Sequence, residues 1–157
     1  MINILRYINN DYFKQLRLDM INDIKNPNCI DCYSLEESSG HSYRNDFNDQ
    51  FKESFIKVLE TNDDGSIDNF ETIYLDFRFS NLCNFKCMDC NYKFSSAIDG
   101  KVSRNSLSDL DLSELEDLKI LGGEPFMDPL YLELFNTLKI ENINLMIVTN
   151  NSIFPNE

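Results

Sequence analysis

A predicted strand that leads directly into a cluster of cysteines constrains this chain more than any other feature. Residues 72–80 alternate between apolar and polar side chains, which is the two-residue period of a half-buried strand. The cysteines Cys83, Cys87 and Cys90 follow in a C-x3-C-x2-C spacing. Thiolates this close together in sequence can hold three irons of a cubane iron-sulfur cluster and leave the fourth iron open. We therefore predict a metal centre at the C-terminal end of a strand.

A second motif, Gly122-Gly123-Glu124-Pro125, follows a second predicted strand over residues 117–121. A pair of glycines lets the backbone come close to a ligand. A carboxylate at the end of a strand can accept hydrogen bonds from an ammonium group. Because each motif follows a strand, and because parallel strands place their carboxyl ends at one edge, we expect both motifs to form one site.

Together the two motifs resemble the radical S-adenosylmethionine (radical SAM) superfamily. By that resemblance, the three cysteines ligate a site-differentiated 4Fe-4S cluster, and the Gly-Gly-Glu-Pro segment binds the methionine amino group of S-adenosylmethionine. The resemblance implies reductive cleavage of S-adenosylmethionine and hydrogen abstraction from a substrate that the sequence does not identify. It also implies a reductant such as a ferredoxin or a flavodoxin as partner. Asp89 stands where many members carry an aromatic residue that lies against the adenine.

The same resemblance implies the fold, which is a partial (β/α)6 barrel of the TIM type. Residues 71–157 would be a truncated radical SAM core, with three of the six strand–helix units. We expect a helix over 129–140 and a third strand over 142–148 that is apolar enough to be buried on both faces. The strand's Thr-Asn-Asn ending resembles the family's Thr-Asn-Gly. A half barrel leaves an unpaired strand edge, so we expect a second chain that completes the barrel, a longer parent protein, or an inactive product.

Residues 1–70 are expected to form a helical extension in front of this core. Apolar positions recur at helical spacing over 11–26 and again over 47–59, so each stretch predicts a helix. Between them, Cys29 and Cys32 form a C-x2-C pair that we expect in a loop. Two thiols do not complete a metal site. A redox dithiol would need a strand before the pair and a helix after it.

A helix, the C-x2-C pair and a following Ser-Tyr-Arg resemble the N-terminal part of radical SAM proteins that contain a twitch domain. By that resemblance, Cys29 and Cys32 would be ligands of an auxiliary iron-sulfur cluster. A purely structural pair is an equal alternative. The rival function is a non-catalytic module in which zinc is shared between this pair and Cys87/Cys90, and an inert fragment is a third alternative.

Charge and composition exclude other classes of function. The formal net charge is -13 over 157 residues, which argues against a surface for duplex nucleic acid. The sequence shows no basic leader with an apolar run and no apolar stretch of membrane-spanning length, so we expect a cytoplasmic protein. In that reducing setting, five cysteines favour metal ligation over disulfides.

Overall fold

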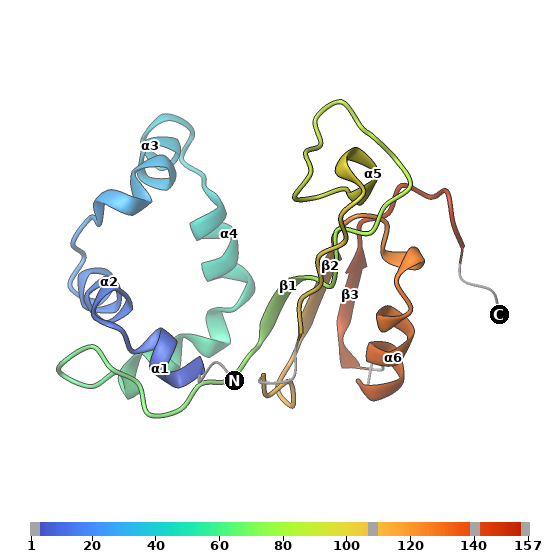
Figure 1. The fold of residues 1–157 in the computed structure, drawn as a ribbon. Coiled ribbons are helices and arrows are strands. Elements are labelled where there is room, and N and C mark those ends of the chain that lie inside the picture. Colours follow the sequence, from blue (N-terminus) through green and yellow to red (C-terminus); the bar gives the residue numbers. More distant parts are fainter. Residues whose placement is uncertain (1–3, 107–109, 139–141, 155–157) are drawn as a thin grey trace. The chain divides into compact units, whose positions relative to one another are not determined.

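The computed structural model describes residues 4–106, 110–138 and 142–154. The chain divides into two compact units, Met1–Phe70 and Glu71–Glu157. Figure 1 shows helices in the first unit and a sheet with helices in the second. Among the described residues, no helix is both long enough and apolar enough to cross a membrane.

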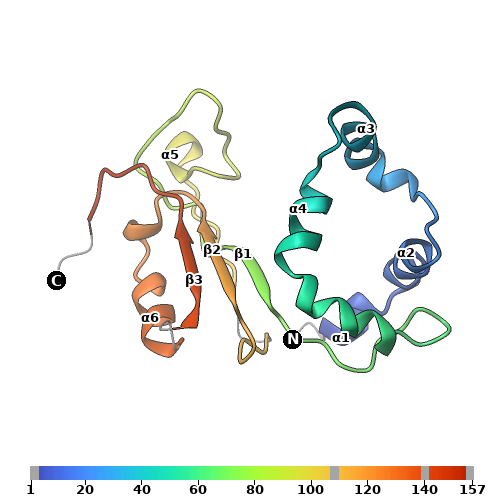
Figure 2. The same cartoon turned by 180° about the vertical axis from the view of Figure 1, so that it is seen from behind.

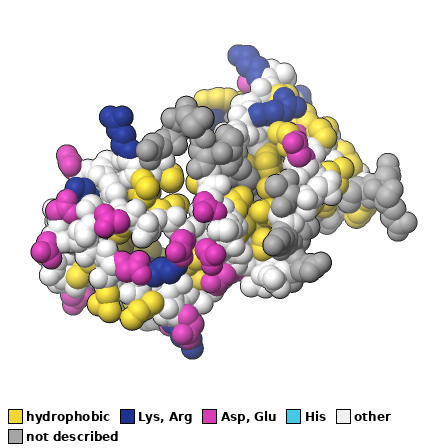
Figure 3. Space-filling model, turned by 90° about the horizontal axis from the view of Figure 1, so that it is seen from below, with side chains coloured by type: hydrophobic (Ala, Val, Ile, Leu, Met, Phe, Trp, Pro, Cys, Tyr) yellow, Lys and Arg dark blue, Asp and Glu magenta, His cyan; other side chains and the backbone are white. Residues whose placement is uncertain are grey.

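The N-terminal unit is built from short helices. They are α1 (Ile4–Ile8), α2 (Asp11–Ile21), α3 (Ile30–Ser39) and α4 (Tyr43–Gln50), with 3-10 helices over Pro27–Cys29 and Lys52–Glu60. Polar side chains begin two of them, because Asn10 accepts a hydrogen bond from the Phe13 N–H at α2 and Ser42 accepts one from the Asn45 N–H at α4. Gly40 ends α3 in the left-handed conformation, with φ 74°. On the face drawn in Figure 3, acidic side chains gather over this unit.

Neither helix prediction for this unit matches the structure in its bounds. The first predicted helix ends at Ile21 instead of residue 26, because Asp23 turns the chain into the left-handed region with φ 56°. The second is divided at Phe51, where α4 has ended. From there the hydrogen bonds join residues three apart, as in the 2.9 Å bond from Ser54 N–H to the Phe51 carbonyl. An apolar repeat alone does not distinguish these two kinds of helix.

The C-terminal unit is α/β, as predicted. Its strands β1 (Tyr74–Arg78), β2 (Asp117–Leu121) and β3 (Asn144–Ile147) form a parallel sheet in the order β1-β2-β3. The described strands make an open three-stranded sheet. Helix α6 (Leu130–Thr137) connects β2 to β3 and covers one face of the sheet, as the two opposite views show (Figures 1 and 2). Residues 139 and 140 of the helix predicted over 129–140 lie outside the described residues.

The core lies between that face and α6. Leu75 pairs with Leu118 and Phe77 with Ile120, so four apolar side chains of adjacent strands share this face. Helix α6 adds side chains that include the buried Tyr131. Burying an apolar side chain of this size contributes about 1.5–3 kcal/mol, so this cluster is the main stabilising element of the unit.

Strand β3 does not match its prediction of burial on both faces. Leu145 is 39% exposed and Met146 is 57% exposed. Only the face that carries Ile147 packs against the core under α6. The opposite face of the sheet is partly polar and carries an ion pair between Lys119 and Asp76, with 3.7 Å between Nζ and Oδ2.

Candidate functional site

Three loops meet at the carboxyl edge of the parallel sheet. The loop after β2 is joined to the loop after β1 by two backbone hydrogen bonds. Gly123 N–H donates to the Ser80 carbonyl at 3.2 Å, and Glu124 N–H donates to the Leu82 carbonyl at 2.7 Å. The Gly-Gly-Glu-Pro motif is therefore held directly against the segment that leads into Cys83.

Close approach of these two loops is the reason for both glycines. A Cβ added at Gly123 would overlap the Leu82 carbonyl oxygen and would lie 2.7 Å from the Asn81 oxygen. Gly122 has φ 143°, and a Cβ there would lie 2.7 Å from the Ser80 oxygen. The glycine pair was predicted to bring the backbone close to a ligand; in this structure it brings the backbone close to the cysteine-bearing loop.

Glu124 is buried, with 1% of its surface exposed, and its carboxylate is fully engaged by this chain. Oε1 accepts from the Phe126 N–H at 3.2 Å. Oε2 accepts from the Asn150 N–H at 2.8 Å, and the Thr149 hydroxyl lies 2.7 and 2.9 Å from the two oxygens. The carboxylate oxygens that were predicted to accept from an ammonium group thus accept here from donors in the loop after β3. Glu124 fixes that loop to the motif.

A second buried carboxylate fixes the start of the cysteine loop. Asp128 is 2% exposed and accepts a 2.6 Å hydrogen bond from the Ser80 hydroxyl. The same hydroxyl oxygen accepts from the Leu82 N–H at 3.3 Å. Asn81 is also buried, and its side chain bonds to backbone groups of Tyr92, Lys101 and Ser103. Buried polar groups are stable only when they are hydrogen-bonded, so this network holds the backbone before Cys83 in one conformation.

The three cysteines of the motif lie on an irregular loop beyond that anchor. Cys83 is half-buried; its N–H donates to the Ser96 hydroxyl at 3.2 Å, and its sulfur accepts from the Phe85 N–H at 3.4 Å. Cys87 is exposed and Cys90 is half-buried, and a turn joins them through a 3.1 Å bond from Cys90 N–H to the Cys87 carbonyl. All three are free thiols. In the described part of the chain, no three His, Cys, Asp or Glu side chains are gathered closely enough to hold a metal ion.

A cavity of about 340 Å³ opens beside these loops. Its walls come from the ends of all three strands and from the segment after the cysteines: Arg78, Phe94, Leu121, Gly122, Gly123, Val148, Thr149 and Asn150. The guanidinium of Arg78 lies over the Phe94 ring, 4.8 Å from its centroid. The cavity thus combines backbone groups, an amide, a hydroxyl and one cation at the edge where parallel α/β proteins bind ligands.

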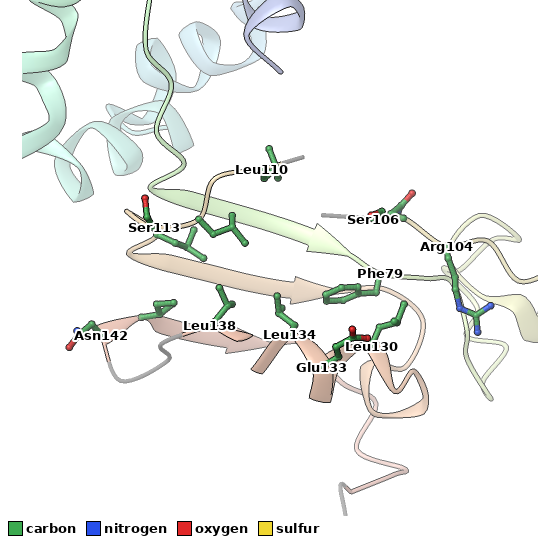
Figure 4. A pocket seen from close by; sticks show the side chains of 14 residues that line it. Phe79, Arg104, Ser106, Leu110, Ser113, Leu130, Glu133, Leu134, Leu138 and Asn142 are labelled. Atoms are coloured by element: carbon green, nitrogen blue, oxygen red, sulfur yellow. The ribbon is translucent and has the colours of Figure 1, made fainter. Parts of the chain in front are cut away.

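A larger hollow of about 1020 Å³ lies elsewhere in this unit, against α6 (Figure 4). Leu134 of the helix and Leu138 just after it line the hollow together with Phe79. No cysteine lines it, and neither does the Gly-Gly-Glu-Pro motif. Leu110 and Ser106 border residues 107–109, which lie outside the described part of the chain. This hollow is an extension of the apolar core, and it brings none of the predicted site residues together.

The C-x2-C pair of the N-terminal unit is not in a loop. Cys29 ends a 3-10 helix and is the N-cap residue of α3, and Cys32 lies in the first turn of α3. Asn26 begins this arrangement, because its side chain accepts from the Asn28 N–H at 3.0 Å. The interaction of the Arg44 guanidinium with Glu36, and to a smaller extent with Cys32, raises the pKa of Arg44. A helix therefore begins between the two cysteines and continues past them, and from residue 4 onward no strand precedes the pair.

Sequence reasoning missed the residues that join the loops. Thr149 and Asn150 were noted only as the end of the third strand, and Ser80 and Asp128 were not selected at all. One feature of the sequence could have indicated them: each is a polar residue within a few positions of a strand end or of the glycine motif. Which of them meet depends on strand order, and a single sequence does not fix strand order.

Comparisons with models of known protein families, with curated proteins and with solved structures gave no match to this chain. The structure by itself defines a class: a parallel α/β unit with a cavity at the carboxyl edge of its sheet, lined in part by the glycine pair, and preceded in sequence by a helical unit.

Proposed function

We propose that this chain is a radical SAM enzyme or the N-terminal part of one. The observation that supports this most strongly is the shared location of its two motifs. Gly122 and Gly123 line a 340 Å³ cavity at the carboxyl edge of a parallel sheet, and Cys83 lies on the adjoining loop. A cluster on the cysteines and S-adenosylmethionine in the cavity would therefore lie side by side.

The residues fit a site-differentiated 4Fe-4S cluster in number and chemistry. Three free thiols, of Cys83, Cys87 and Cys90, lie within eight residues on a loop that is largely exposed. Binding would require these three sulfurs to converge, because in the described part of the chain no three such side chains are gathered closely enough to hold a metal. When bound, the cluster would supply one electron for reductive cleavage of S-adenosylmethionine.

The chain's own residues would orient the ligand beside that centre. Gly122 and Gly123 line the cavity in which the methionine moiety would lie, and their contact with the cysteine-bearing loop would place that moiety beside the cluster. Glu124 contributes by holding the loop after β3 in place, and its carboxylate is not needed as a direct ligand contact. Arg78 is the cation in the cavity wall, and it offers a counter-charge for an anionic group.

The fold proposal goes with the function. Three parallel strands in sequential order, with α6 on one face, are what the first half of a partial (β/α)6 barrel would contain. On the face away from α6, Met146 at 57% exposure and Val148 at 48% leave apolar surface open. Further strands, from a second chain or from a longer parent protein, would cover it.

The test is anaerobic reconstitution with iron and sulfide, followed by metal analysis of purified protein. The wild-type chain should take up close to one cubane, and Cys87→Ala should lose most of the bound iron, because two thiols hold a cubane poorly. Cys29→Ala is the matched control, since it removes the same group from the other unit. Retention of wild-type iron in Cys87→Ala would overturn the proposal, and so would stoichiometric zinc held by Cys29, Cys32, Cys87 and Cys90.

A further inference from the structure

One side chain connects the two halves of the proposed site. Asn150, directly after β3, donates its backbone N–H to Glu124 Oε2 at 2.8 Å. Its side-chain nitrogen Nδ2 lies 3.9 Å from Cys83 Sγ and 3.1 Å from Asn84 Oδ1. The same residue thus touches the glycine motif through its backbone and the first cysteine through its side chain.

The orientation of the Asn150 amide is fixed by its neighbours. Its oxygen Oδ1 accepts a 2.9 Å hydrogen bond from the Ser152 N–H, and a backbone N–H can only donate. The nitrogen must therefore face the cysteine loop. Asn84 reinforces this direction, because its own Nδ2 donates to the Ser152 hydroxyl at 2.9 Å and leaves its oxygen to accept from Asn150.

Cys83 receives two N–H groups as a result. The Phe85 N–H lies 3.4 Å from the sulfur on one side, and the Asn150 amide approaches from another strand end. A hydrogen bond donated to a cluster thiolate stabilises the reduced cluster more than the oxidised one, because reduction adds negative charge to the sulfurs. Such bonds are among the factors that set the potential of an iron-sulfur centre.

We propose that Asn150 is a positioning residue that holds Cys83 and, by donating to its sulfur, raises the reduction potential of the cluster. This inference rests on the proposed function, since it needs a cluster at Cys83. The inference adds a specific way in which the loop after β3 would set the reduction potential of the cluster.

The experiment compares the reduction potentials of reconstituted chains of residues 1–157, measured by redox titration that is monitored by electron paramagnetic resonance without S-adenosylmethionine. Asn150→Ser is the main variant. A serine hydroxyl can still accept from the Ser152 N–H in the same kind of turn, but it is too short to reach the Cys83 sulfur. Asn150→Ala is the second variant. Asn151→Gly is the matched control, because it removes a neighbouring amide at a position with φ 56° that glycine accepts without strain.

Both Asn150 variants should shift the potential to a more negative value, and Asn151→Gly should leave it unchanged. Loss of iron from both Asn150 variants, with unchanged circular dichroism and full iron in Asn151→Gly, would also support the positioning role. Wild-type potential and iron content in both Asn150 variants would overturn this inference and leave the proposed function standing. A wild-type chain that takes up no cubane would overturn both.

Discussion

The two units of this chain are stabilised in different ways. In the described part of the N-terminal unit, Tyr33 is the one buried apolar side chain. Its segments are joined by a buried hydrogen bond from Asn26 to Asp19 at 2.8 Å and by ion pairs nearer the surface, such as Lys25–Glu37 at 2.7 Å and Arg44–Glu36 at 2.6 Å. The C-terminal unit has a contiguous apolar core and buried carboxylates, Glu124 and Asp128, that bind its loops together. The three cysteines of the motif, Cys83, Cys87 and Cys90, belong to the C-terminal unit. A buried polar network can hold a site in one geometry, whereas exposed ion pairs contribute little to such order.

The largest expected effect is in the apolar core of the C-terminal unit. Leu118 is 1% exposed on the central strand, so Leu118→Ala should lower the free energy of unfolding by about 2–5 kcal/mol through lost burial and the cavity left behind. Leu35→Ala is the matched control. Leu35 is 48% exposed on α3, and its removal should change the free energy of unfolding by about 0.5 kcal/mol or less. Native-state hydrogen exchange of the β2 and α3 amides, followed as a function of urea concentration, measures the loss in the free energy of unfolding in each unit. Equal losses in the two variants would mean that the units do not differ as described.

A smaller effect is expected where a buried carboxylate binds the loops. Glu124→Gln keeps the shape of the side chain but directs an NH2 group toward donors from Thr149, Asn150 or Phe126. We expect a loss of about 1–3 kcal/mol in the free energy of unfolding, since a buried donor then lacks an acceptor. The same substitution at the exposed Glu114 should have almost no effect. Urea denaturation curves of both variants provide the measurement, and wild-type stability in Glu124→Gln would show that the network is dispensable.

The smallest effect concerns the ion pairs of the N-terminal unit. Hydrogen bonds from Arg44 and then Ser42 lower the pKa of Glu36 below its ordinary value of 4.5. Because the folded-state pKa lies below the unfolded-state value, this contribution is present above about pH 4.5 and is lost as pH falls through the folded-state pKa. Thermal unfolding of this unit should therefore show a shallower acid dependence in Glu36→Gln than in the wild type. A parallel acid dependence in the two proteins would exclude Glu36 as a contributor.

The comparison also separates what the sequence could predict from what it could not. Residues 117–121 were predicted as a strand and form β2, in which the apolar side chains of Leu118 and Ile120 alternate with polar ones before Gly-Gly ends the strand. Helix α3 was not predicted: it begins at Ile30, within the stretch expected to be a loop, and it has no side-chain cap to announce it. Strand β3 was wrongly expected to be buried on both faces, since an apolar composition does not reveal how many layers cover it. The link from Glu124 to Asn150 depends on parallel pairing of β2 with β3, which no local pattern encodes.

The central claim is that Cys83, Cys87 and Cys90 hold a cluster with one iron open to S-adenosylmethionine. The most direct test is electron paramagnetic resonance of the anaerobically reconstituted and reduced chain, recorded with and without S-adenosylmethionine. We predict a cubane signal whose shape changes when S-adenosylmethionine is added, and which is absent in Cys83→Ala. A cubane signal that is indifferent to S-adenosylmethionine, or a chain that binds zinc in place of iron, would contradict the claim.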